Sequence, residues 1–207
     1  EWQLALDECQ KALNLGNVEL MDLNSFPGRE ENRYILDVEN PEIIFTQGYS
    51  ATNVFYKNIS YFTICSFSCS EELISLYNSF DDQVIKDLRL NAFFEDNGDE
   101  QYRVSKVGEK VYDCFVIRSA ELYLNKAEAE AMLDKAEAIQ TIKTLLNNRF
   151  EGGIPDIDGL SGKDLVSFIR DERRRELCFE AHRWFDLRRY AVSPKYPEKK
   201  SIKHTTY

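Results

Sequence analysis

Residues 172–189 read ERRRELCFEAHRWFDLRR, and this stretch decides the fold. Its charged side chains recur every three or four residues, so Glu172, Glu176 and Glu180 share one face of a helix with Arg183. Arginines surround these glutamates and keep their carboxylates ionised, whereas a general acid needs a raised pKa. We therefore interpret the stretch as the centre of a structural ion network. Its expected members are Arg118, Glu121, Glu172, Arg175, Glu176, Glu180, Arg183, Asp186 and Arg189.

Catalytic roles suit the same residues less well. Glu172 and Glu176 would serve a glycoside hydrolase only if they flanked a sugar-sized cleft as acid and base. The segment Glu180-Ala181-His182 lacks the Glu-x-x-His spacing of a di-iron bundle. The sequence also contains no nucleophile elbow, phosphate loop or dinucleotide fingerprint. We expect no catalytic residue, no cofactor and no enzyme activity.

The segments around this stretch have the apolar periodicity of helices. One stripe spans residues 117–131 and a second spans 139–150, which predicts an antiparallel helix pair. The alanines in these stripes let helices approach closely, as in tetratricopeptide repeats. Residues 1–16 predict one further helix. The last helix is expected to begin after Ser161 and to run to about Tyr190, with a kink near Ala181.

The remaining chain predicts loops and short elements. Residues 43–45 are apolar enough for one strand, and a helix is expected after Ser70. Residues 102–107 and 111–115 flank a glycine and predict a β-hairpin. The expected class is all-α, with tetratricopeptide-like helical hairpins, long irregular loops and at most a small β-hairpin. A single domain is expected, divided into a repeat helix (1–16), a loop-rich insertion (17–69), short helices and a hairpin (70–115), a helical core (116–190) and a tail (191–207).

The loop-rich insertion is the better candidate for ligand contacts. Long loops within a compact domain are often functional, and this one is rich in aromatic residues. Aromatic rings pack against the C–H faces of sugars while amide side chains bond to the hydroxyls. The alternative is that these rings form a core beneath the loop. The expected ligand contacts are Tyr49, Asn53, Tyr56, Asn58 and Tyr61.

Composition excludes several classes of function. The net charge of −10 opposes binding to nucleic acid or anionic lipid. No run of apolar residues is long enough to cross a bilayer. The five cysteines, at positions 9, 65, 69, 114 and 178, contain no C-x-x-C pair, and only two histidines are present. No metal site is expected, and the disulfide state stays open.

Several motifs in order along the chain resemble the SusD/RagB family of Bacteroidetes-type bacteria. They cover about residues 1–190, and their sequence order makes chance agreement improbable. The later motifs are IRSAELYL at 117–124, KAEA at 126–129, NNR at 147–149, IRDERRREL at 169–177 and RWFDLRR at 183–189. The earlier ones are NPEIIF at 40–45, SEEL at 70–73 and DLR at 87–89, after a helix at 2–13. Many relatives carry a glycine in place of Ala181.

The resemblance implies a non-catalytic binding protein that captures a glycan or a peptide. Its partner would be a SusC-like TonB-dependent transporter, on which the protein sits as a lid at the extracellular face of the outer membrane. The resemblance further implies that this chain is the middle to C-terminal portion of a longer lipoprotein, whose lipid anchor lies in the N-terminal part. Ligand contacts vary among family members, so no motif can be carried over as a binding site.

Two other functions remain open at this stage. A helical-repeat scaffold would bind a protein through a concave helical face, and a carboxylate glycoside hydrolase would use Glu172 and Glu176. Neither the ligand nor the oligomeric state follows from the sequence.

Overall fold

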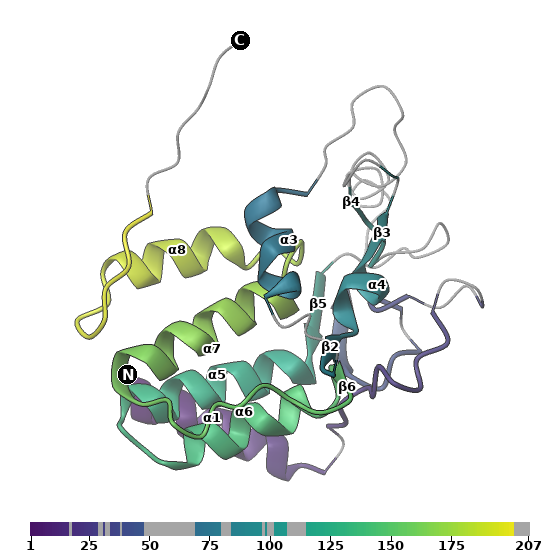
Figure 1. Cartoon of the computed structure of the whole chain (residues 1–207). Helices are drawn as coiled ribbons and strands as arrows, with labels where there is room; N and C mark the ends of the chain where they lie inside the picture. The colour runs from purple at the N-terminus through teal and green to yellow at the C-terminus, as the bar shows by residue number, and fades with distance from the viewer. Residues whose placement is uncertain are drawn as a thin grey trace.

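The computed structural model describes residues 1–16, 18–28, 31, 34–37, 39–47, 69–79, 84–96, 98, 102–106 and 115–200 (Figure 1). The elements are, in chain order, α1 (Trp2–Asn14), β1 (Ile43–Gln47), α3 (Glu71–Asn78), β2 (Lys86–Asp87), α4 (Arg89–Phe93), β3 (Phe94–Asp96), β4 (Tyr102–Val104), β5 (Phe115–Arg118), α5 (Ser119–Met132), α6 (Glu137–Leu146), β6 (Phe150–Glu151), α7 (Gly162–Glu176) and α8 (Arg183–Ala191). The helical class that we expected is confirmed.

Helix α5 is the centre of a helical layer. It packs against α1, α6 and α7, and Figure 1 shows these helices side by side. The interface contains fully buried small residues, among them Ala120, Ala127 and Ala138, next to Leu124 and Ile142. Because alanine side chains are short, the helices approach closely and larger residues fill the space between them. The predicted antiparallel pair is therefore confirmed as α5 and α6.

The last helix is not one kinked helix, as expected, but two separate ones. Helix α7 ends at Glu176, and α8 begins at Arg183. Between them, Phe179 and Ala181 have φ angles of 62° and 65°. A left-handed residue cannot continue a right-handed helix, so the polypeptide changes direction here. At the start of α7, Ser161 is the N-cap residue but makes no side-chain capping bond.

Short strands join distant parts of the chain. Residues 107 and 111–114 of the predicted hairpin lie outside the described residues, and the described ends of that stretch have other partners. Strand β4 pairs with β3, and β5 pairs with β1. In the link between β3 and β4, Gly98 has a φ of 82°, and its N–H donates to Asp96 Oδ1 at 2.8 Å.

A second apolar core lies under α3 and α4. It contains Leu73, Ile74, Tyr77, Phe93 and Phe94, all buried. The Ser70 side chain caps α3 by accepting from the Leu73 N–H, as the sequence suggested. The hydroxyl of Tyr77 donates to the Arg175 carbonyl at 2.7 Å and so ties this core to the end of α7. Within the described ranges, no helix is long and apolar enough to span a membrane.

Candidate functional site

The five expected ligand contacts lie outside the described residues. Tyr49, Asn53, Tyr56, Asn58 and Tyr61 belong to the stretch 48–68, of which the structure says nothing. The expected ion-network residues, in contrast, are all described.

The carboxylate of Glu176, near the end of α7, is the meeting point of three arginines. Arg118 Nη1 lies 2.6 Å from Glu176 Oε1, Arg149 Nε lies 2.9 Å from Oε2, and Arg89 Nη1 lies 3.1 Å from Oε2. All four side chains are at most 2% exposed. Burial raises the pKa of Glu176, but the three guanidinium groups lower it more strongly. The pKa of Glu176 therefore lies well below the ordinary value. Glu176 is therefore an ionised carboxylate.

Glu42 completes one side of this arrangement from just before β1. Its two oxygens lie 2.7 Å from Arg118 Nη1 and 2.5 Å from Arg149 Nη2. The Met21 N–H donates to Glu42 at 2.9 Å, and Arg149 Nη1 donates to the Met21 carbonyl at 2.7 Å. The network thus fixes the backbone of the segment before β1 to α7.

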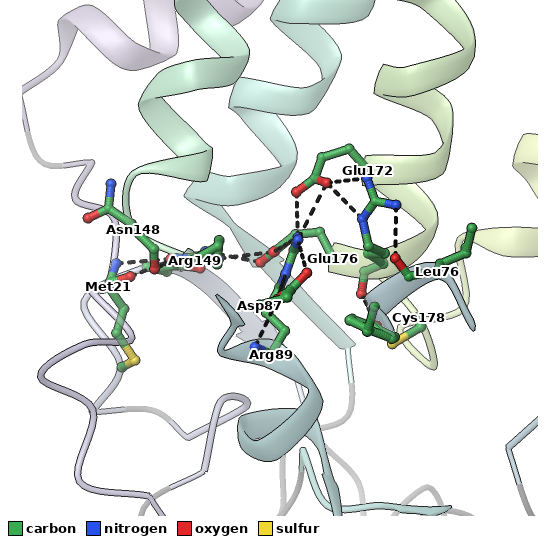
Figure 2. A network of polar contacts seen from close by, with 12 residues as sticks. Met21, Leu76, Asp87, Arg89, Asn148, Arg149, Glu172, Glu176 and Cys178 are labelled. Carbon is green, nitrogen blue, oxygen red and sulfur yellow. Dashed lines mark hydrogen bonds and ion pairs between the residues drawn. The ribbon is translucent and has the colours of Figure 1, made fainter. Parts of the chain in front are cut away.

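Glu172 forms the other side. Arg89 Nη1 lies 2.5 Å from Glu172 Oε1, and Arg175 Nη2 lies 2.7 Å from Oε2. Asp87 holds Arg89 through a second pair at 2.7 Å. Figure 2 shows Arg89 between Asp87 and the two glutamates of α7. Arg89 and Arg149 thus reach α7 from two different segments of the chain.

Glu180 extends the network beyond the end of α7. Its carboxylate accepts from Lys106 Nζ at 2.6 Å and from Arg118 Nη2 at 2.9 Å. Burial raises its pKa, but Arg118 and Lys106 lower it more strongly, to about 2. The carbonyl groups of Glu176 and Cys178 also accept from Lys106 Nζ, at 2.7 and 3.0 Å. Each of the three N–H groups of the Lys106 ammonium therefore has an acceptor.

A second cluster joins α5, α7 and α8. Asp186 binds Arg173 at 2.9 Å and Arg189 at 3.0 Å, while Glu128 binds Arg189 at 2.6 Å. Glu121 lies at its edge, 3.5 Å from Arg173 Nη2. The structure therefore divides the expected network into two clusters. Arg183 makes no ion pair within the described part of the chain.

Sequence reasoning missed five members of the central network. They are Glu42, Asp87, Arg89, Lys106 and Arg149, each from a different turn or short element. Four of the five lie in motifs that resemble the family: Glu42 in NPEIIF, Asp87 and Arg89 in DLR, and Arg149 in NNR. No such signal marked Lys106.

The network is not built for acid–base catalysis. Glu172 and Glu176 have no exposed side-chain surface, and their pKa values are lowered below the ordinary value because the neighbouring arginines outweigh the effect of burial. A general acid needs the opposite shift and access to substrate. No group of three metal-binding side chains gathers among the residues described. Cys9, Cys69 and Cys178 are free and buried, whereas Cys65 and Cys114 lie outside the described ranges.

A surface hollow lies above the Glu42 side of the network. Its volume is about 220 Å³. Its lining residues are Met21, Phe26, Pro27, Tyr34, Asp37, Glu39 and Asn40. Met21 and Asn40 also line a second, smaller space together with Glu42, Arg118, Arg149 and Glu176, so the hollow lies next to the central network.

Comparisons with known proteins agree on one family. Residues 89–207 match the model of the SusD family. A SusD-like protein P38 of Formosa agariphila is 36% identical over 103 residues, which are 43% of this chain and 20% of that protein. A SusD-like carbohydrate-binding protein of Bacteroides vulgatus has a similar structure, with a TM-score of 0.66 and 24% identity over 90% of this chain and 41% of its own.

A SusD superfamily protein of Bacteroides thetaiotaomicron has the same fold, with a TM-score of 0.65 and 21% identity. The match covers 90% of this chain and 45% of that one. This chain therefore spans less than half the length of each of these three relatives.

Proposed function

This chain belongs to the SusD family, and from that premise we propose that it is part of a non-catalytic protein that binds extracellular nutrients. The nutrient would be a glycan or a peptide, delivered to a SusC-like TonB-dependent transporter. Attachment to the outer face of the outer membrane through an N-terminal lipid belongs to the same proposal. The family match over residues 89–207 is the observation that carries it.

Two further observations support this proposal. The glutamates that a hydrolase would need are ionised and buried among arginines. The Bacteroides vulgatus relative is a carbohydrate-binding protein, which favours a glycan over a peptide as the first ligand to test. The insertion residues Tyr49, Asn53, Tyr56, Asn58 and Tyr61 stay our prediction for contacts with that ligand.

Isothermal titration calorimetry of this chain against oligosaccharides and short peptides tests the proposal. Saturable binding, with the ligand recovered intact, is the expected result. A panel without any binding would instead favour the scaffold function. Cleavage of a bound sugar that disappears in Glu176→Gln, at an unchanged melting temperature, would overturn the non-catalytic assignment.

A further inference from the structure

Helix α8 presents an apolar face to solvent. Trp184, Phe185 and Val192 are 61%, 68% and 80% exposed, whereas Asp186 and Tyr190 on the other side of the helix are buried. Figure 1 shows α8 at the edge of the molecule, beyond α7. Helical spacing brings residues 184, 185, 188 and 192 together on one side. The outer face of α8 therefore consists of Trp184, Phe185, Arg188 and Val192.

Arg188 lies in the middle of this outer face. It is exposed, and its side chain pairs with no other residue in the described part of the chain. Its neighbour Arg189 differs, because it binds Asp186 and Glu128. The long stem of an arginine packs along apolar surface while its guanidinium reaches beyond it. Arg188 therefore offers its charge to an anionic group outside the protein.

Further positive charge gathers at the start of α8. Arg183 makes no ion pair among the residues described, and burial and the nearby guanidinium of Arg174 lower its pKa. The carboxylate of Glu72 also acts on Arg183, but it already binds Arg174 and Lys200. The protein as a whole carries a net charge of −10. Because physiological salt screens charges beyond about 8 Å, the local arginines decide which groups approach α8.

The size of the outer face separates its possible occupants. Aromatic side chains cover about 150–250 Å² each, so at these exposures the face offers roughly 300–400 Å² of apolar surface. A stable interface between two proteins needs about 800 Å² on each partner. A lipid surface needs no such area, because single rings enter it, and tryptophan prefers the boundary between headgroups and acyl chains. The combination of exposed aromatic rings with an unpaired arginine favours lipid.

We infer that the outer face of α8 rests on a lipid surface that carries anionic phosphate headgroups. The rings of Trp184 and Phe185 enter the boundary below the headgroups, and Arg188 binds phosphate. The inference rests on the proposed function, which places the protein at the outer membrane. A single lipid chain holds a protein only marginally, so this second contact strengthens the attachment and fixes the orientation of the domain.

Sedimentation with lipid vesicles tests the contact. The probes are vesicles of phosphatidylcholine and vesicles of an equimolar mixture of phosphatidylcholine with phosphatidylglycerol. We expect saturable binding to the mixed vesicles, weakened about tenfold or more by the double substitution Trp184→Ala with Phe185→Ala. Both side chains are exposed, so the melting temperature of this variant should stay within a few degrees of wild type.

The charge has its own variant. Arg188→Gln should weaken binding to the mixed vesicles about fivefold and binding to phosphatidylcholine less than about twofold. The matched control for the apolar contact is Leu4→Ala with Leu15→Ala, because both leucines are exposed on or next to α1. This control should change vesicle binding less than about twofold.

Tryptophan fluorescence reports on the contact directly. The chain contains two tryptophans, and Trp2 is partly buried against the helical core. The emission of Trp184 should move to shorter wavelength on addition of mixed vesicles, since its ring leaves water. Trp184→Phe should abolish this shift while it keeps most of the binding, because phenylalanine also enters the boundary.

Four results would overturn the inference. They are an unchanged emission wavelength at saturating vesicles, equal binding by the double variant and wild type, equal binding of wild type to both kinds of vesicle, and a dimer in sedimentation velocity that the double substitution abolishes. The last result would assign the outer face of α8 to a second copy of the chain. Absence of binding to all vesicles would also overturn the inference but not the proposed function, because nutrient binding is measured by calorimetry without lipid.

Discussion

Three guanidinium groups converge on the carboxylate of Glu176, and none of them reaches bulk water. Each is an expensive charge to bury, and the pairing with carboxylates offsets that cost. Compared with an apolar core of the same shape, the ion pairs add little to the stability of the fold. Removing one partner is strongly destabilising, because it leaves a buried charge without compensation.

The substitution Glu176→Gln should therefore destabilise the protein strongly. We expect the free energy of unfolding to fall by about 3–5 kcal/mol, measured by chemical denaturation at pH 7. Glu72→Gln is the matched control, since Glu72 also pairs with an arginine, Arg174, but its side chain is 63% exposed. Although Arg174 and Lys200 lower the pKa of Glu72 to about 2, water screens these pairs, and the control should lose about 1 kcal/mol or less. Equal losses in the two variants would contradict the structural role of Glu176.

The break between α7 and α8 shows what the sequence could and could not predict at the scale of elements. Apolar stripes predicted α5 and α6 because apolar residues recur there at helical spacing, and most residues of the two stripes are buried. The same reasoning continued α7 too far, since Phe179 and Ala181 are ordinary helix residues by propensity. The tertiary contacts of Lys106 and Arg118 with Glu180 hold the turn in place. The pairing of the strands could not be predicted for a similar reason. Strand β5 pairs with β1, and Arg118 lies opposite Ile43, which is 75 residues earlier in the chain.

Ala181→Gly should stabilise the turn between α7 and α8. A left-handed conformation costs an L-residue roughly 1–2 kcal/mol, and glycine avoids that cost while losing more freedom on folding. We expect a net gain of about 0.5–1 kcal/mol in the free energy of unfolding, measured by thermal or chemical denaturation. Ala5→Gly, inside α1, is the control. Its free energy of unfolding should fall by a similar amount, because glycine destabilises the interior of a helix. A loss in Ala181→Gly would mean that the left-handed turn carries no strain.

At the scale of the whole molecule, the central network joins segments that lie far apart in the sequence. Helical spacing gathered Glu172, Glu176 and Glu180 because they lie on one face. Nothing in that spacing brings in Glu42, Arg89 or Arg149, which look in the sequence like ordinary polar residues of turns and short elements. Their positions depend on how α5, α6 and the strands pack, and only the motifs shared with the family pointed to them.

The same network makes stability depend on pH. In the folded protein the pKa of Glu180 is about 2, below the ordinary value of 4.5. A carboxylate with a lowered pKa stabilises the fold above its unfolded pKa and loses that contribution as the pH falls through the folded value. We expect the free energy of unfolding to drop between about pH 4.5 and 2, by on the order of 3 kcal/mol from Glu180.

Urea denaturation at a series of pH values measures this dependence. The free energies of unfolding of wild type and Glu180→Gln should differ clearly at pH 6 and converge toward pH 2. Protonation at low pH removes the charge of Glu180 in wild type, and the variant lacks that charge at every pH. Parallel curves for the two proteins would show that Glu180 is not held ionised by Arg118 and Lys106.

The order of the network along the chain has a consequence for biosynthesis. A growing polypeptide that ends after β6 already carries Glu42, Arg89, Arg118 and Arg149, but not the carboxylate at residue 176 that joins the three arginines. Until α7 emerges, these arginines must stay hydrated, because their full set of partners does not yet exist. The central network thus closes only when α7 has been synthesised, and the nascent chain keeps these three arginines in water until then.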